Sequence, residues 1–248
     1  MSEDPSGGLA STLTLADWRR AVGNLYADVR RLAIDDPAAA LDHWRTVRER
    51  LFREHPQSPV PEDRRASFRP EHFPRDPALR FEVVVEPLDA AMAPSAVAES
   101  AAPGLAAPGP IDFGSGLGSG GSGLLSIELP VSAGGVMAFR RFGVVTIPFP
   151  EGSRRLEIYW MEGYAGGLFL PFRDATNGVE TYGAGRYLLD AAKSADLGGD
   201  RDGGTLILDF NFAFQPSCAF DPKWACPLAP PSNRLDVAVR AGERLATA

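Results

Sequence analysis

The chain has 248 residues, 44% of them hydrophobic, and a formal net charge of −7. That length and apolar fraction are sufficient for one large domain with a packed core, which excludes a chain that is disordered throughout. The acidic balance argues against a protein that acts mainly by binding nucleic acid, because such proteins need a basic face. The 2 cysteines are too few for a disulfide framework or a four-thiolate zinc site.

The first ten residues include Glu3 and Asp4 and contain no apolar run, so they do not resemble a signal peptide. No segment of the chain has the roughly 20 uncharged apolar residues that a membrane span requires. We therefore expect a cytoplasmic protein without a membrane partner. In that compartment the cysteines are expected to be thiols.

Apolar residues in the first quarter of the chain recur every three or four positions, which predicts two amphipathic helices. Thr14 is the predicted N-cap of the first helix. Asp36 followed by Pro37 predicts the start of the second, and Pro56 its end. We expect residues 1–13 to be disordered and residues 14–56 to form a helical segment that packs on the rest of the chain.

Residues 57–248 are predicted to form one antiparallel β domain. Short β-branched and aromatic runs alternate with turn residues, and no helical pattern separates them. Between the first two runs, residues 90–123 are almost entirely Ala, Pro, Gly and Ser, which predicts a flexible low-complexity loop. The predicted fold is mainly β, an antiparallel β-barrel or sandwich with two N-terminal α-helices. The expected strands are 80–86, 124–131, 136–149, 155–161, 167–173, 185–190, 205–214 and 235–240.

The segment from residue 172 to residue 187 is rich in polar residues around an Asn177-Gly178 pair, which predicts a two-residue hairpin turn. Polar side chains on both sides of this turn would then meet at one end of the barrel. Alternatively, some of them shape the turn and the others form a cross-strand ion pair. On the segment alone the structural alternative is favoured. The candidate ligand-binding residues here are Asp174, Thr176, Glu180, Tyr182 and Arg186.

The run from Thr205 to Phe214 is the clearest predicted strand, with Leu and Phe side chains alternating onto one face. Asp209 and Asn211 alternate onto the opposite face, which either contacts solvent or lines a pocket for a polar ligand. The Pro-rich segment that follows contains Asn233, which either satisfies backbone groups of the loop or reaches into the same pocket.

Cys218 and Cys226 also lie in this Pro-rich segment. Three interpretations remain open, in decreasing order of preference: small buried hydrophobic residues, a reversible redox pair, or two ligands of a metal completed elsewhere. No metal site is predicted, because two thiolates without a nearby His or Cys make a poor one.

Several uncommon motifs occur in the same order as in the domain-of-unknown-function 1684 family. They are FRDATNGVETYGAGRY, LDFNFAFQPSCAF, CPLAPPSNRL and the closing AGE. The segment HWRTVRERLFREHPQSPV and the stretch FPRDPALRF resemble the shorter bacterial members, so the resemblance covers most of the chain from about His43 to Arg244. Two features depart from the family pattern. They are Phe212 and Phe214, where members often carry a basic or small residue and a tyrosine, and the Ala/Pro/Gly/Ser tract in place of a compact turn.

The resemblance implies that the candidate residues are hallmark positions of the family, including Asp174 to Arg186, Asp209, Asn211, Asn233 and both cysteines. It does not name a reaction or a cofactor. It favours a polar network shared by these residues over the purely local roles considered above. A fold needs few buried polar groups, and each of them must be hydrogen-bonded, so a group of several such hallmark residues points to a common network.

Three hypotheses follow. The first is a protein that binds a small polar or anionic ligand, with Arg186 contacting the anion. The second is an enzyme in which Asp174, Glu180 and Asp209 act as acid–base groups or metal ligands. The third is a structural or partner-binding protein whose polar network only stabilises the fold. A homo-oligomer is compatible with each of them.

Overall fold

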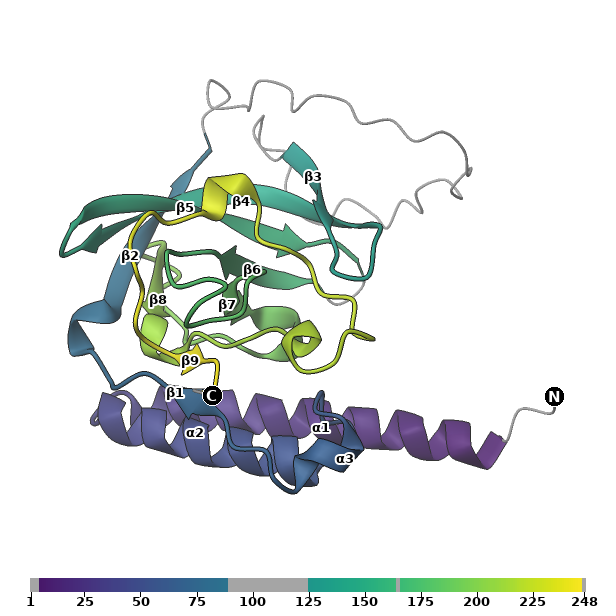
Figure 1. Cartoon of the computed structure of the whole chain (residues 1–248). Coiled ribbons are helices and arrows are strands. Elements are labelled where there is room, and N and C mark those ends of the chain that lie inside the picture. Colours follow the sequence, from purple (N-terminus) through teal and green to yellow (C-terminus); the bar gives the residue numbers. More distant parts are fainter. Residues whose placement is uncertain (1–4, 89–124, 164–165, 247–248) are drawn as a thin grey trace, which may run out of the picture.

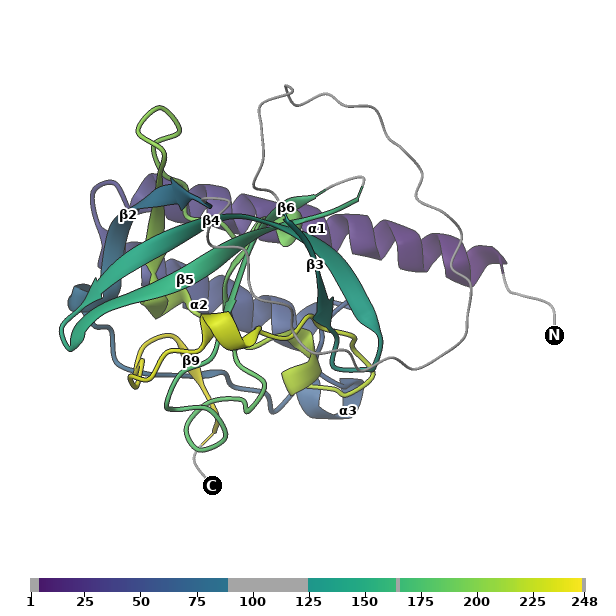
Figure 2. The ribbon, with the colours of Figure 1, turned by 90° about the horizontal axis from the view of Figure 1, so that it is seen from above.

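The computed structural model describes residues 5–88, 125–163 and 166–246. The predicted loop at 90–123 therefore lies outside the described residues. Two long helices run side by side beneath a curled antiparallel sheet, and the N-terminal part of the first helix projects beyond the sheet (Figures 1 and 2). The mainly β prediction with two N-terminal helices is confirmed, and the sheet has the form of a half barrel.

The first helix, α1, spans Pro5–Leu32, and so begins before the N-cap predicted at Thr14. Residues 5–13, which we expected to be disordered, are helical, whereas residues 1–4 lie outside the described part of the chain. The second helix, α2, spans Pro37–Glu54, as Asp36 and Pro56 predict. The Asp36 carboxylate accepts hydrogen bonds from the backbone N–H groups of Ala38 and Ala39, both at 3.0 Å. A single turn, α3, follows at Glu62–Arg65.

The main sheet is antiparallel throughout, with the order β7-β6-β5-β4-β2-β8 and with β3 also paired to β4. The two longest strands, β4 and β5, cross over α1 (Figure 2). A separate two-stranded pair is formed by β1 at Glu71–His72 and β9 at Glu243–Arg244. The main strands are β2 (Arg80–Pro87), β3 (Leu125–Pro130), β4 (Val136–Phe149), β5 (Gly152–Met161), β6 (Gly167–Phe172), β7 (Arg186–Asp190) and β8 (Thr205–Asp209).

Two strand predictions are wrong. The predicted strand at 205–214 stops at Asp209, because the Asp209 carboxylate caps a 3-10 turn at Phe210–Phe212. Phe210 then packs inside the sheet, whereas Phe212 and Phe214 pack toward the helices. The second error is at 235–240, where no strand forms.

The predicted two-residue turn at Asn177-Gly178 is also wrong. β6 and β7 do pair antiparallel, but the whole of residues 173–185 connects them. Of these two residues only Gly178 has a positive φ, of +81°, whereas the predicted turn type needs a positive φ at both of them. The Asn177 side chain instead holds the loop together, since its Oδ1 accepts from the Asp174 N–H at 2.6 Å.

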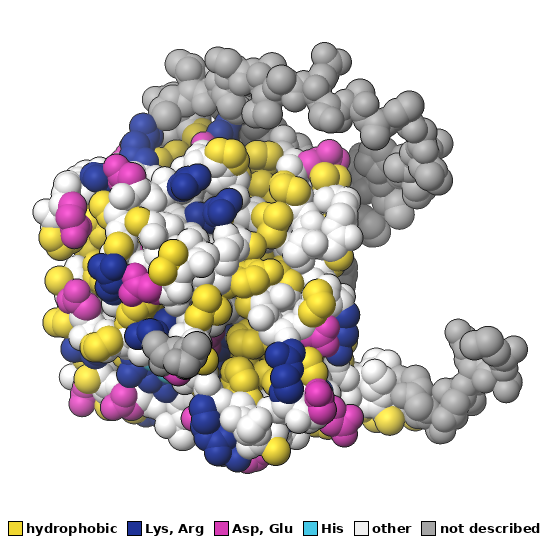
Figure 3. All heavy atoms as spheres, viewed as in Figure 1, with side chains coloured by type: hydrophobic (Ala, Val, Ile, Leu, Met, Phe, Trp, Pro, Cys, Tyr) yellow, Lys and Arg dark blue, Asp and Glu magenta, His cyan; other side chains and the backbone are white. Residues whose placement is uncertain are grey.

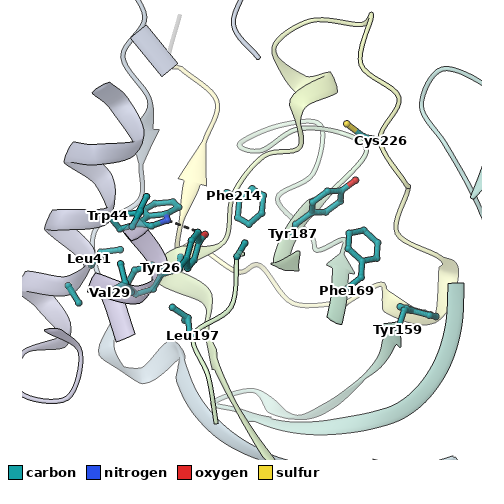
Figure 4. Close-up of a cluster of buried hydrophobic side chains, with 14 of the residues drawn as sticks. Tyr26, Val29, Leu41, Trp44, Tyr159, Phe169, Tyr187, Leu197, Phe214 and Cys226 are labelled. Atoms are coloured by element: carbon teal, nitrogen blue, oxygen red, sulfur yellow. Dashed lines mark hydrogen bonds between the residues drawn. The ribbon is translucent and has the colours of Figure 1, made fainter. Parts of the chain in front are cut away.

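The core has two parts. One lies inside the curled sheet and contains Leu156, Ile158, Leu170, Phe172 and Phe210. The other joins the helices to the sheet and is centred on Val29, Leu41, Trp44, Phe169 and Phe214. Figure 4 shows this second part, in which the Trp44 indole N–H donates to the Tyr26 hydroxyl at 3.1 Å. The helices therefore complete the core on the open side of the half barrel.

Candidate functional site

Arg186, the candidate anion-binding residue, is fully buried at the start of β7. Its guanidinium donates to the carbonyl oxygens of Val239 (2.7 Å), Ala241 and Glu243 (3.1 Å) and to the Asp174 carboxylate (3.2 Å). Burial lowers the pKa of Arg186, and the neighbouring Asp174 carboxylate opposes that shift. These contacts attach the C-terminal segment to the sheet and leave the charge neutralised by the protein itself.

Asp174 is equally buried, and its remaining contacts are also internal. Its carboxylate accepts from the Thr176 hydroxyl (2.8 Å) and from the Val239 N–H (2.7 Å). Thr176 in turn shares a hydrogen bond with the Thr181 hydroxyl (2.8 Å). This part of the predicted cluster is therefore one closed network that shapes the loop between β6 and β7.

The other predicted residues of that loop do not join this network. Glu180 is partly exposed and pairs with Arg240, whose side chain lies 2.9 Å from it at the surface. The hydrogen bonds from Arg240 lower the pKa of Glu180. Tyr182 points elsewhere, because its hydroxyl is hydrogen-bonded to Cys218.

Asp209 and Asn211 form a second, separate network. The Asp209 carboxylate accepts from the Asn211 backbone N–H (3.0 Å) and side-chain amide (2.8 Å), and lies 3.6 Å from Arg80. Asn211 also pairs with both backbone groups of Asp76, at 2.8 Å each. Burial raises the pKa of Asp209, although Asn211 and Arg80 oppose that shift.

Asn233 forms a third network. Its Oδ1 accepts from the Glu157 N–H (2.8 Å), and its amide donates to the carbonyls of Glu157 and Pro171 (2.9 Å each). The side chain thus joins β5 and β6 through their backbones. The hydrogen bonds of the three networks all end on protein groups, and Arg186 Nε is the one buried atom of these residues without a partner in the described part of the chain. This supports the structural interpretation of these residues. Asp174 and Asp209 thus belong to separate networks and Glu180 to a surface ion pair, which disfavours a shared acid–base site.

A different region has the properties of a binding site. A pocket of about 410 Å³, which we call the outer pocket, lies between α1 and the loops that follow β7 and β8. Its walls are largely apolar, and the Trp18 and Trp224 side chains line it together with Cys226. Its charged lining residues are Arg19 and Lys193. Pockets of this volume with apolar walls and few charged groups are typical of small-molecule sites.

A smaller pocket of about 80 Å³, the inner pocket, lies next to the outer one and is bounded by the second part of the core. Two polar residues that line it, Asp190 and Gln215, are buried. No described residue donates a hydrogen bond to Asp190 Oδ1 or Gln215 Oε1. A buried acceptor without a donor costs about 1–3 kcal/mol, which is unusual away from functional sites. The two pockets share Trp18, Val22, Pro59, Lys193 and Ser217.

Lys193 connects the two pockets electrostatically. Its ammonium group lies 2.8 Å from the Asp190 carboxylate. Burial lowers the pKa of Lys193, but the Asp190 carboxylate raises it by more, so the pKa is raised overall. The nearby Arg19 lowers it slightly. Among the described residues no carboxylate pairs with Arg19. The outer pocket therefore has one cation that is not neutralised and a second that is shared with Asp190.

Cys226 lines this pocket, and Cys218 lies behind it. Both are buried free thiols, and the Cys218 N–H donates to the Cys226 sulfur at 3.2 Å. A hydrogen bond from the Cys226 thiol, with a further contribution from the Tyr182 hydroxyl, lowers the pKa of Cys218 to about 6. The pKa of Cys226 is raised by the same contact with Cys218. Within the described part of the chain, no group of three or more His, Cys, Asp or Glu side chains could hold a metal ion.

Sequence reasoning identified the cysteines and missed the rest of the pocket. The apolar periodicity of the first predicted helix places Trp18 on its apolar stripe, and nothing in the sequence points to Lys193 or Arg19. The signal available in the sequence was the large apolar residues Leu15 and Trp18 at the N-terminal end of that stripe. It did not indicate which residues from the distant Pro-rich segment would face them.

Comparisons with known proteins agree with the sequence resemblance. Residues 124–244 match the family described as "Protein of unknown function (DUF1684)". This part of the chain belongs to that family. The solution NMR structure of an uncharacterized protein from Haloarcula marismortui is similar, with 29% sequence identity and a TM-score of 0.51. The likeness covers 84% of this chain and 93% of that one, so it extends beyond the family match. None of the curated proteins compared matches the chain.

These comparisons assign no activity to the DUF1684 region. None of the helices in the described ranges is long and apolar enough to cross a membrane.

Proposed function

We propose that this protein binds a small amphipathic anion in the outer pocket. The observation that carries the proposal is the pocket lining, in which two indole rings and two cations surround about 410 Å³. An aromatic or aliphatic body suits the apolar walls, and a carboxylate, sulfonate or phosphate suits Arg19 and Lys193. The proposal keeps the anionic ligand expected from the sequence and places its charge on these two residues in place of Arg186.

The apolar walls support a ligand of limited size. Trp18 also stacks on Phe52, with ring centroids 6.0 Å apart, so α2 holds this wall in place. On the opposite side, the Trp224 indole N–H donates to the Pro59 carbonyl at 3.2 Å. Both rings are thus fixed before a ligand binds, which reduces the entropy lost on binding. Hydrophobic side chains gather in a hollow above the helices on the face that Figure 3 shows, beside Lys and Arg side chains.

The test compares two probes that differ in charge. Anilinonaphthalene sulfonate has an aromatic body and an anionic group, whereas N-phenylnaphthylamine has a similar body and no charge. We expect the sulfonate to bind saturably. Its binding is measured by the fluorescence of the dye and by the quenching of the protein's tryptophan fluorescence. Lys193→Met and Arg19→Met should each weaken sulfonate binding about three- to tenfold, or about 0.7–1.4 kcal/mol. Neither should change binding of the neutral probe.

Arg20→Met is the matched control. Arg20 follows Arg19 in the sequence, but it does not line the pocket: its side chain is exposed and lies 4.0 Å from Asp17. Trp224→Ala should weaken both probes, since it removes an apolar wall. Equal sulfonate affinities in the Lys193, Arg19 and Arg20 variants would refute the proposed anion site. A cytoplasmic location remains a prediction from the sequence.

A further inference from the structure

The pair of thiols beside the outer pocket supports a second and independent inference. Cys218 lies in a short 3-10 turn at Ser217–Ala219, and Cys226 lies in the extended segment after Trp224. The Cys218 N–H donates to the Cys226 sulfur at 3.2 Å, so the two residues are neighbours across the loop. The chain has 2 cysteines in total, and each therefore has the other as its nearest thiol partner.

The loop around the thiols is held at several points. Ser132, in the turn between β3 and β4, accepts from the Cys226 N–H (3.0 Å) and donates its hydroxyl to the Trp224 carbonyl (2.9 Å). The Ser132 N–H in turn donates to the Cys226 carbonyl (2.9 Å). This anchoring holds the Cys226 backbone near that of Cys218 and limits the entropy that closing a bond between them would cost.

The surroundings favour one negative charge on the pair. The Cys218 sulfur accepts from the Cys226 thiol, which is the largest of the contacts that lower the pKa of Cys218 to about 6. Once one proton has left, the second is retained, so the pKa of Cys226 is raised. In such a coupled pair the charge belongs to both sulfurs, and a thiolate is the species that attacks a disulfide.

The outer pocket supplies access to this pair. Cys226 lines it together with Trp224 and Ser217, whereas Cys218 lies behind. Lys193 also lines the pocket, and its charge partly offsets the rise in the pKa of Cys226 that the hydrogen bond with Cys218 and burial cause. A reagent that enters the pocket therefore meets Cys226 first, and an anionic reagent is attracted by the cations on the same wall.

We propose that Cys218 and Cys226 are a redox pair that closes to a disulfide by exchange with a small, carboxylate-bearing disulfide that enters the outer pocket. The Cys226 sulfur attacks one sulfur of the incoming disulfide as its proton passes to Cys218, which forms a mixed disulfide and expels one thiolate. Cys218 then gives its proton to that leaving group and attacks the Cys226 sulfur. The second thiolate departs and takes a proton from solvent, so the protein loses two electrons and the incoming disulfide becomes two thiols. This chemistry does not require the ligand proposed above.

The test uses the full chain and oxidised glutathione, followed by alkylation of free thiols with N-ethylmaleimide and intact mass spectrometry. We expect the wild-type protein to lose two hydrogens and to carry neither glutathione nor maleimide, and dithiothreitol should restore both thiols. Cys218→Ser should retain one glutathione on Cys226. Cys226→Ser should react at least about tenfold more slowly, because Cys218 is not at the pocket wall.

Three results would overturn the proposal. They are two alkylated thiols after exposure to glutathione disulfide, glutathione on both cysteines of the wild type, or a disulfide-linked dimer in place of the internal bond. Equal reaction rates in the two serine variants would also contradict it. Circular dichroism checks that each variant is folded. Because the wild-type result alone decides whether the bond forms, a variant that fails to fold leaves the test intact.

A second measurement tests the role of the pocket. Oxidised glutathione carries carboxylates, whereas hydroxyethyl disulfide is neutral. We expect the ratio of their reaction rates to fall several-fold in Lys193→Met and to stay unchanged in Arg20→Met. An unchanged ratio in Lys193→Met would show that the pocket cations do not guide the disulfide. If the dye does not bind but the disulfide still closes as expected, the proposed ligand site is refuted and the proposed redox pair is not.

Discussion

Replacing Arg186 with methionine tests whether the most prominent polar residue of the chain is structural. The substitution keeps an unbranched side chain of similar length and removes the charge. It leaves three backbone carbonyls without their donor, and it leaves the Asp174 carboxylate buried without a cation. Asp174 keeps its hydrogen bonds from Thr176 and Val239, which limits the loss.

The expected cost follows from the burial of both partners, whose side chains are each 0% exposed. Breaking a fully buried ion pair from one side typically costs about 3–5 kcal/mol. That is a large fraction of the roughly 5–15 kcal/mol by which domains are stable. The matched control is Glu180→Gln, because its pair with Arg240 is at the surface and should contribute less than about 1 kcal/mol.

Urea unfolding followed by tryptophan fluorescence measures both variants. We expect a much lower midpoint for Arg186→Met with an unchanged slope, and a midpoint near wild type for Glu180→Gln. The double variant Arg186→Met/Asp174→Leu should lose less than the sum of the two single changes, because no charge is left unpaired. A loss below about 1 kcal/mol in Arg186→Met, together with weaker probe binding, would refute the structural role and return Arg186 to a binding site.

Three further predictions concern local structure and pH. Gly185 has φ +104°, and an added Cβ would lie 2.5 Å from the Phe172 carbonyl oxygen, so Gly185→Ala should lower the free energy of unfolding by about 2–4 kcal/mol. Gly183→Ala should be near neutral in the same urea assay, since its nearest atom lies at 3.8 Å. Asp36→Ala should cost about 1 kcal/mol by loss of the α2 cap, and a melting temperature equal to wild type would contradict this. Burial lowers the pKa of His72 from 6.5 to about 4, so only the unfolded chain binds a proton between these values. Stability should therefore fall by about 2 kcal/mol as the pH drops from 6.5 to 4, and His72→Phe should flatten that slope in urea midpoints measured across the range.

The sequence predicts those elements whose causes are local. Asp36 and Pro37 start α2 because a carboxylate cap and a fixed φ act within one turn. The alternation of apolar residues predicts most of the strands, since successive side chains point to opposite faces. The same logic fails at Phe212, because Asp209 caps a turn there and redirects the chain toward the helices.

The role of the polar residues depends on tertiary contacts. The sequence placed Asp174, Asp209 and Asn233 in one candidate cluster because they share a polar character in one half of the chain. The structure assigns them to three networks, each bound to backbone groups of a different distant segment. Hydrogen-bond partners of this kind follow from the path of the chain in space and are not encoded in the spacing of the residues.

By itself the sequence determined the mainly β fold, the two helices, the acidic net charge and the two cysteines in a Pro-rich segment. Only the tertiary structure decided where a ligand could enter. The outer pocket exists because α1 packs across the loops after β7 and β8, which brings Trp18 and Arg19 opposite Lys193, Trp224 and Cys226. Those residues are separated by most of the chain, and packing between such distant segments is set by the whole core and leaves no local pattern to detect.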